Sequence, residues 1–161
     1  MVILLMKIKI ILVGKTREAF LQQGEAIFLK RLRRYTKCDI IVVRPVRLTA
    51  GTNENVVRQK EGERILQKCD ASEWTIVLDS KGQQMSSEKL ANFILQRKNS
   101  GIHGMTFIIG GPVGLAQEVL QQANIVLSLS RMTFTHEMTR LILYEQLYRA
   151  FTIIKGEKYH K

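Results

Sequence analysis

The sequence predicts a single α/β domain, spanning residues 1–161, built on a mainly parallel sheet with helices on both faces. Apolar segments of strand length alternate with segments of helical spacing, which is the pattern of repeated strand–helix–strand units. No linker-like stretch and no internal repeat interrupts this alternation. Residues 1–5 precede the pattern and are interpreted as an N-terminal extension, with Met6 as a candidate natural start.

Strands and helices alternate through the first half of the chain. Residues 6–13 alternate lysine with isoleucine and then run apolar, which predicts a strand that ends at Gly14. Apolar residues at helical spacing predict a helix over residues 17–36. A second strand is predicted over residues 39–43, and the polar segment 54–68 is expected to form a surface helix.

The second half of the chain continues the alternation. Short apolar runs predict buried strands, and longer segments between them have helical spacing. The predicted strands are 74–79, 105–109 and 125–129, and the predicted helices are 87–98, 116–122 and 136–151. Ser86 is the expected N-cap of the first of these helices, and residues 152–161 form a basic tail.

The basic composition favours a polyanionic partner. Lys and Arg total 25 against 14 Asp and Glu, which gives a formal net charge of +11. Nucleic acid is the leading candidate, and a charge that serves only solubility is the alternative. The RNA-binding candidates are Lys30, Arg33, Arg34 and Lys37, whose spacing would place them on one face of the first helix, away from its apolar stripe.

The two cysteines indicate a reducing environment. Cys38 and Cys69 stand far apart and outside any metal-binding spacing, which favours a cytoplasmic protein without a disulfide framework or a metal site. The apolar start of the chain is soon followed by lysines, whereas a membrane span needs about 20 apolar residues. We therefore expect no membrane association.

Three loops are candidate ligand sites, because parallel α/β sheets bind ligands beyond the carboxyl ends of their strands. These loops follow Asp79 or occupy residues 110–114 and 129–135. Glycines in the second loop let the backbone approach a ligand, although a tight turn would use them equally well. The third loop offers backbone groups to an adenine or a ribose, although Thr133 or Thr135 could simply be an N-cap.

The last predicted helix carries charged residues one turn apart. His136 and Arg140, and likewise Glu145 and Arg149, can each share a helix face. Pairing at the surface is the usual role of such charges, and His160 in the basic tail could belong to a disordered end. Patterns alone therefore support a basic α/β domain with a ligand site at the strand ends, and they do not identify the ligand.

Several motifs, most of them in the C-terminal third, resemble a known family. They are Phe107-Ile-Ile-Gly-Gly-x-x-Gly114, Leu127-Ser-Leu-Ser-Arg-Met-Thr-Phe134 with His136, Leu141-x-x-x-Glu145-Gln-Leu-Tyr-Arg-Ala-Phe151, and the ending Lys155-Gly-Glu-x-Tyr159-His160. With the start Met6-Lys-Ile-x-Ile-x-x-Val-Gly14-Lys15, they resemble the RlmH family of SPOUT methyltransferases. The resemblance runs from Met6 to Lys161, and its specific part is the block 110–160.

The resemblance implies a fold and an activity that the patterns alone do not predict. It implies a C-terminal trefoil knot that binds S-adenosylmethionine, and a homodimer. The implied activity is methylation of N3 of a pseudouridine in helix 69 of 23S rRNA, within the assembled ribosome. The implied cofactor contacts are Leu78, Gly110, Leu129, Ser130, Arg131, Met132, Thr133 and Phe134. Thr135 departs from the family pattern, which has proline there, and this removes a rigid turn before His136.

The implied reaction needs a proton to leave the target nitrogen. N3 of a uracil-type ring carries a proton near neutral pH, and no metal is needed because a sulfonium methyl is already electrophilic. We expect Arg149 to stabilise the anionic base and Tyr159 or His160 to assist proton removal, with His136 as an outside candidate. The alternatives are a SPOUT methyltransferase that acts on tRNA and a non-catalytic ribosome- or RNA-binding domain.

Overall fold

Strands and helices alternate strictly along the part of the chain that the computed structural model describes, residues 6–161. The predicted extension, residues 1–5, lies outside it. The elements are β1 (Lys7–Val13), α1 (Ala19–Leu32), β2 (Cys38–Val43), α2 (Glu54–Leu66), β3 (Trp74–Gln84), α3 (Ser87–Asn99), β4 (Gly104–Ile109), α4 (Gln117–Gln122), β5 (Ile125–Ser128) and α5 (His136–Ile154). The predicted order of elements is confirmed.

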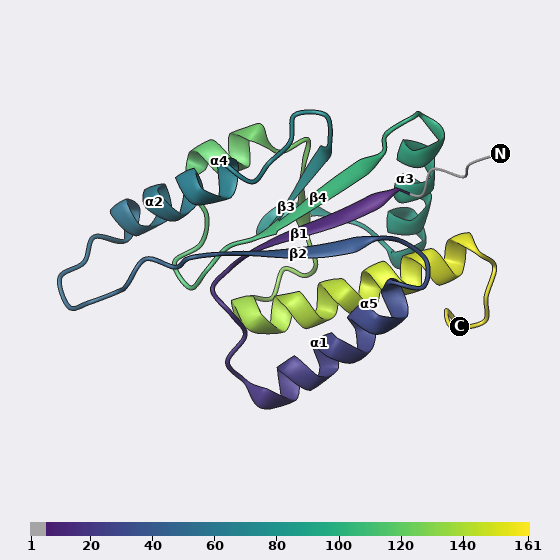
Figure 1. The fold of residues 1–161 in the computed structure, drawn as a ribbon, viewed down its shortest axis with the longest axis horizontal. Coiled ribbons are helices and arrows are strands. Elements are labelled where there is room, and N and C mark those ends of the chain that lie inside the picture. Colours follow the sequence, from purple (N-terminus) through teal and green to yellow (C-terminus); the bar gives the residue numbers. More distant parts are fainter. Residues whose placement is uncertain (1–5) are drawn as a thin grey trace.

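The five strands form one parallel sheet in the order β2-β1-β4-β3-β5 (Figure 1). Successive side chains of a strand point to opposite faces, so Ile8 and Ile10 of β1 pack in one apolar cluster and Ile11 and Val13 in another. Helices α1, α3 and α5 cover the first face, and α2 and α4 cover the second. The predicted parallel sheet with helices on both faces is confirmed.

Strand β3 is longer than the sequence predicts. It was expected to end at Asp79, yet it continues to Gln84, and Leu127 of β5 pairs with both Leu78 and Gln83. A Cβ atom on Gly82 would lie 2.5 Å from the carbonyl oxygen of Val126, so the backbone passes β5 too closely for any side chain. The segment after Asp79 therefore winds against the end of β5. The threading of the trefoil knot stays a prediction.

Helix α1 is shorter than predicted, because it ends at Leu32. Arg34 and Lys37 consequently lie beyond the helix, and the expectation that four basic residues share one helical face was wrong. The chain turns there to enter β2, and the buried hydroxyl of Thr36 donates to the carbonyl of Met6. This anchor fixes the turn from α1 into the sheet.

Candidate active site

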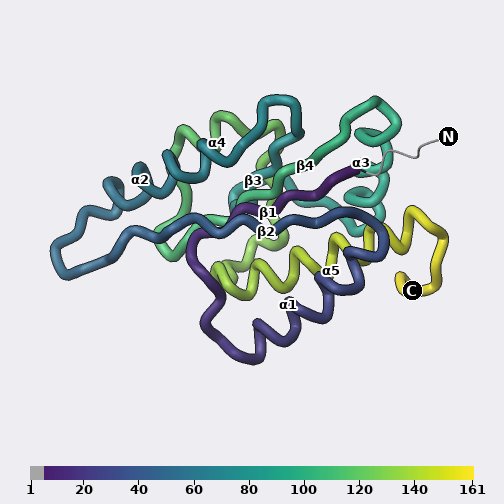
Figure 2. Tube along the Cα trace, in the orientation of Figure 1, coloured from purple at the N-terminus to yellow at the C-terminus, as the bar shows by residue number. Residues whose placement is uncertain are grey.

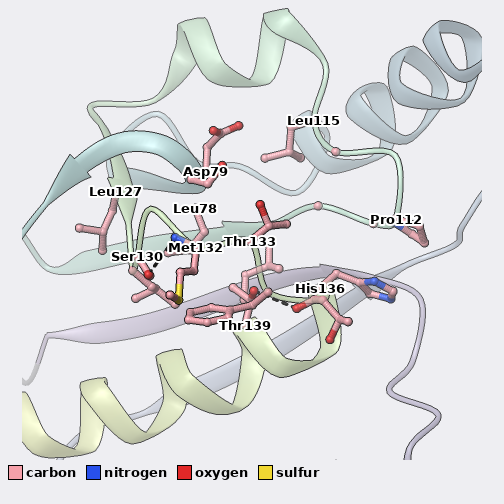
Figure 3. A pocket seen from close by; sticks show the side chains of 18 residues that line it. Leu78, Asp79, Pro112, Leu115, Leu127, Ser130, Met132, Thr133, His136 and Thr139 are labelled. Carbon is pink, nitrogen blue, oxygen red and sulfur yellow. Dashed lines mark hydrogen bonds between the residues drawn. The ribbon is translucent and has the colours of Figure 1, made fainter.

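A cavity of about 450 Å³ opens beside the middle of β3, at residues 78–80, and at the carboxyl ends of β4 and β5 (Figure 3). Its walls come from these parts of the strands, the glycine turn after β4, the loop between β5 and α5, and the first turn of α5. The predicted cofactor contacts that line it are Leu78, Gly110, Leu129, Ser130, Met132, Thr133 and Phe134. Arg131 is exposed and is not among the lining residues. The three candidate loops thus meet at one cavity.

The glycine turn brings bare backbone to the cavity wall. A Cβ atom on Gly110 would lie 2.8 Å from Cγ of Leu115, so no side chain fits at this position. Gly114 adopts a positive φ of 82° and its N–H donates to the carbonyl of Gly111 at 3.1 Å. The glycines thus form a tight turn that also lines the cavity, so the two uses that the sequence left open are compatible.

Serine hydroxyls hold the loop between β5 and α5. The Ser128 hydroxyl donates to the carbonyl of Ser130 at 2.8 Å, and the Ser130 hydroxyl accepts the N–H of Met132 at 3.0 Å. Thr135 is the N-cap of α5, because its hydroxyl accepts the N–H of Met138 at 3.1 Å. The cap occupies the position where the family pattern has proline, and Thr133 takes no part in it.

The first turn of α5 is tied to the sheet by buried charges. Arg140 is fully buried and donates to the carbonyl of Val13 at 2.7 Å and to the hydroxyl of Thr16 at 2.9 Å. It is therefore a structural residue and not half of a surface pair with His136. Burial, and then the nearby Arg140 charge, lower the pKa of the half-buried His136 below its usual value, so this imidazole is neutral at pH 7.

A second group of functional candidates lies at the other end of α5. The Arg149 guanidinium donates to Oε1 of Glu145 at 2.6 and 3.1 Å, and this bond raises the pKa of Arg149. Tyr159 donates its hydroxyl to the same Glu145 oxygen at 3.0 Å, and its ring centroid lies 4.7 Å from Cζ of Arg149. His160 Nδ1 lies 3.2 Å from Nη1 of Arg149. The structure thus brings the three predicted catalytic residues together, in what we call the tail cluster: Glu145, Arg149, Tyr159 and His160.

The partners of His160 determine which ring nitrogen carries its proton. A guanidinium can only donate, so Nδ1 accepts from Arg149, and Nε2 donates to Oε1 of Glu88 at 2.7 Å. Burial and the bond to Glu145 raise the pKa of Tyr159, so its hydroxyl is a donor at neutral pH. His160 can accept a proton only after it releases Arg149.

The C-terminal tail packs on the helices rather than fraying. The rings of Tyr159 and Tyr148 are 4.6 Å apart between centroids. Tyr35 donates to a carboxylate oxygen of Glu157 at 2.5 Å, which raises the pKa of Tyr35 to about 12. Helix α5 itself extends to Ile154, three residues beyond its predicted end at residue 151. A disordered end for His160 was the wrong alternative.

The cavity and the tail cluster are far apart within one chain. Arg149 follows His136 by thirteen positions on α5, which corresponds to about 20 Å along a helix. Figures 1 and 2 show the C-terminus at the opposite end of α5 from the loop that enters it. No single copy of the chain therefore brings its own tail cluster to its own cavity in this arrangement.

The remaining site predictions have mixed outcomes. All four basic candidates, Lys30, Arg33, Arg34 and Lys37, are exposed. The cavity residues that the site prediction omitted are Asp79, Ser80, Ile109, Gly111, Pro112, Gly114, Leu115, Leu127, Thr135, His136 and Thr139. The strand-end rule already indicated the loop after Asp79, and Thr139 could have been found from its position one turn after His136. Nothing in the sequence marked Leu115.

Comparison with known proteins gives the family of the chain. A family model described as "Predicted SPOUT methyltransferase" matches residues 6–160. The chain belongs to the SPOUT methyltransferase family. Two relatives with the name "Ribosomal RNA large subunit methyltransferase H" come from Halothermothrix orenii, at 50% identity, and from Bacillus pumilus, at 45% identity. Each alignment covers 97% of this chain and 100% of the relative. The resemblance to the RlmH family is confirmed.

Solved structures share the SPOUT fold of this chain at low sequence identity. A probable methylase family protein from Haemophilus influenzae Rd KW20 aligns with a TM-score of 0.55 at 15% identity, over 98% of this chain and 71% of that one. A probable methyltransferase from Bordetella pertussis Tohama I has a TM-score of 0.55 at 9% identity, over 92% and 98% of the two chains. These likenesses show the fold alone.

Residues 6–161 contain neither a membrane-spanning helix nor a group of metal-ligating side chains. Across residues 6–161, no helix has the length and apolar character that crossing a membrane requires. In the same residues, no three His, Cys, Asp or Glu side chains are grouped as metal ligands would be.

Proposed function

We propose that the chain is a cytoplasmic, S-adenosylmethionine-dependent methyltransferase that methylates N3 of a pseudouridine in helix 69 of 23S rRNA, within the assembled ribosome. The observation that carries this proposal is the cavity beside β3 and at the ends of β4 and β5, where the loops of the family motifs meet. The names of relatives that match the whole chain support the rRNA substrate. The net charge of +11 suits a polyanionic partner.

The cavity fits the proposed cofactor in size and chemistry. Ligand cavities in proteins typically measure about 300–1,000 Å³, and this one has about 450 Å³. Leu78, Leu127 and Phe134 provide apolar walls for an adenine, while bare backbone at Gly110 permits a close approach. Bound S-adenosylmethionine would supply an electrophilic methyl group there. The chain's own residues would orient this group and exclude water.

The tail cluster suits the proton chemistry of the target base. Removing the N3 proton leaves negative charge on the ring and its oxygens, which the permanently charged Arg149 would stabilise. Tyr159 keeps its proton at neutral pH and would donate a hydrogen bond to a ring oxygen. His160 is the candidate proton acceptor once the substrate displaces Arg149 from Nδ1. His136 stays the less favoured candidate for removing the proton.

A homodimer would unite the two parts of the site. About 20 Å separates them within one copy, so the tail cluster of one copy would serve the cavity of its partner. Helix α1, which packs beside α5, exposes Phe20 and Ile27 two turns apart, at 61% and 50% exposure. Large apolar side chains exposed on one helix face are typical of an interface between subunits. The loop before α5 would then face a second chain.

The basic residues near the end of α1 would bind rRNA phosphates. Lys30, Arg33, Arg34 and Lys37 cluster where α1 turns into β2 rather than on one helical face. Changing Lys30, Arg33 and Arg34 to Glu is expected to weaken ribosome binding and to flatten its salt dependence. Cofactor affinity should persist in this variant. An unchanged salt slope would mean that these charges serve solubility only.

Two measurements test the proposed function. Calorimetry with S-adenosylmethionine should show binding to the purified chain, whereas a non-catalytic RNA-binding domain would show none. Methyl transfer should then be measured on intact ribosomes, free 23S rRNA and tRNA. Transfer to intact ribosomes with little to the other two RNAs supports the proposal. Preferential transfer to tRNA would replace it with the tRNA-modifying alternative.

A further inference from the structure

A second cavity, of about 800 Å³, lies at the carboxyl ends of β1 and β2 beside the first. Pro112 and His136 line both cavities, so the glycine turn and the start of α5 form the wall between them. Strands β1 and β4 are neighbours in the sheet, but the chain continues from β1 to β2 on one side and from β4 to β5 on the other. The wall stands at this change of direction. Open α/β sheets bind ligands at such switch points, so the position of the second cavity is that of a ligand site.

The second cavity is strongly basic. Four exposed cationic side chains line it, Lys15, Arg17, Arg44 and Arg47, and none of them has an ion-pair partner among residues 6–161. The carboxylate of Glu137, which also lines the cavity, accepts two backbone N–H groups and is buried. Unpaired cations around a hollow favour a phosphate ligand.

The walls of this cavity would also hold an aromatic ring. Val42 and Leu48 remain 43% and 46% exposed, and together with Pro45 and Val113 they line the hollow. Exposed aliphatic side chains beside cations fit a ligand with one apolar face and one anionic group. A nucleotide has both, whereas free phosphate has only the second.

Buried Glu61 adds an acceptor that has no donor. Its side chain is 3% exposed, and Oε1 accepts the N–H of Val46 at 3.1 Å. Oε2 has no hydrogen-bond partner among the described residues. That oxygen is shielded from solvent in the free chain, and an unsatisfied buried carboxylate oxygen is costly, so a movement of the cavity wall that let a ligand N–H or O–H reach it would be favourable. Nucleobases and riboses carry such donors.

We infer that the second cavity binds one nucleotide of the RNA strand next to the methylated base. Its phosphate contacts Arg44 and Arg47, its base packs on Pro45 and Leu48, and Glu61 accepts a hydrogen bond from the base or ribose. This inference rests on the proposed function, because that function supplies the RNA strand. The enzyme then holds a neighbour of its target, which adds a nucleotide contact to the recognition of ribosome shape.

The first test compares two charge-matched double variants in the full chain. Arg44→Gln with Arg47→Gln removes two cations of the cavity, and Lys68→Gln with Lys98→Gln removes two from elsewhere. The cavity variant should raise the KM for ribosomes about tenfold, as expected for two phosphate contacts, with kcat and cofactor affinity unchanged. The control should change KM less than about twofold. Equal effects of the two variants would overturn the inference.

A direct binding measurement avoids the ribosome. Uridine 5′-monophosphate added to the full chain should shift the backbone NMR signals of Gly14, Val46 and Leu48, and inorganic phosphate should shift them less. Glu61→Gln keeps an acceptor for Val46 while replacing the free oxygen with a donor, so it should weaken these shifts at an unchanged melting temperature. Absence of nucleotide-induced shifts, or equal shifts with phosphate, would contradict the inference.

The two proposals fail in different ways. If the unaltered chain transfers no methyl group to any RNA, the proposed function is wrong. If it methylates ribosomes and the Arg44 and Arg47 variant behaves like the control, only the nucleotide site in the second cavity is wrong.

Discussion

The two ends of α5 carry different kinds of chemical group. At its N-terminal end, the cavity is made largely of backbone and apolar side chains, with bare backbone at Gly110 and a hydroxyl cap at Thr135. At its C-terminal end, Arg149, Tyr159 and His160 contact one another or share Glu145. A ligand-binding site can rest on backbone shape, whereas proton chemistry requires particular side chains. Under the proposed function, the helix would therefore join a binding end to a reactive end.

Removing the tail should produce the largest effect and separate the two ends most sharply. Deleting residues 157–161 removes Tyr159 and His160 and is expected to lower methyl transfer by about 100-fold or more. Cofactor affinity should stay nearly unchanged, because none of the residues that line the cavity is deleted. The melting temperature should also fall, since the contact of Tyr159 with Tyr148 contributes about 1 kcal/mol. Near-normal transfer would return the chemistry to Arg149 and His136.

Filling the glycine turn should affect the binding end alone. In Gly110→Val, the new side chain meets Leu115 at 2.8 Å, so the turn must shift. We expect S-adenosylmethionine to bind about 100-fold more weakly, a loss of about 2.7 kcal/mol. Calorimetry measures this affinity, and the tail cluster should keep its contacts. Unchanged affinity would remove Gly110 from the site.

Mixed dimers should show whether the two ends cooperate across subunits. A Gly110→Val copy has an intact tail and a tail-deleted copy has an intact cavity, so a mixed dimer contains one complete site. Mixing the two impaired proteins, at a cofactor concentration too low to occupy the Gly110→Val cavity, should restore up to about a quarter of normal transfer under random exchange, since half of the dimers are then mixed and each has one of two sites. Transfer measured before and after mixing tests this expectation. No recovery in dimers shown to exchange would confine the site to one copy.

The N-cap of α5 should matter moderately. Thr135→Ala removes the acceptor for the Met138 N–H and should lower the free energy of unfolding by about 1 kcal/mol. Thr135→Pro also loses the cap, but the native φ of −60° already suits proline, which restricts the unfolded chain. Thermal unfolding should therefore rank the proline variant above the alanine variant. The reverse order would show that the structure around residue 135 does not accept a proline ring.

The smallest expected effect is a pH dependence at the binding end. The pKa of His136 is lower in the folded chain than in the unfolded chain, so the unfolded chain binds more protons as the pH falls. Stability from this group is present above about pH 6.5 and declines below it. His136→Gln should reduce the loss of melting temperature between about pH 7 and pH 5. An identical loss in both proteins would mean that burial does not perturb this histidine.

The sequence predicts helices and strands well where their apolar residues follow one clear period. It predicts the ends of these elements poorly where contacts with distant parts of the chain determine them. The runs around Ile108 and Val126 are short and apolar, so their strands were identified within about two residues. The end of β3 was missed because its last residues pair with β5, which follows some 40 residues later. The ends of α1 and α5 were missed because they depend on tertiary contacts. Thr36 bonds to Met6 after α1, and Tyr159 packs on Tyr148 after α5.

The candidate site was likewise predicted where its features are local in the sequence and missed where they depend on distant contacts. Family motifs located the glycine turn and the loop before α5, which are local features, although the predicted contacts were fewer than half of the residues that line the cavity. Arg140 was interpreted as a surface charge because helical spacing cannot distinguish a buried arginine that bonds to Val13 from an exposed one. The separation of the cavity from Arg149 was also hidden, although it follows from helix length once the last helix is placed. The second cavity, beside Glu61, had no sequence signal.

The pairing of β5 with β3 determines when the sheet can be completed during synthesis of the chain. β5 begins at Ile125, so a ribosome must release most of the chain before the sheet can be completed. Until then, the edge of β3 is open, and an open edge can pair with other chains. Because β5 and α5 supply much of the cavity wall, ligand binding should be among the last properties that a newly made copy acquires. Chains truncated before Ile125 are therefore expected to aggregate.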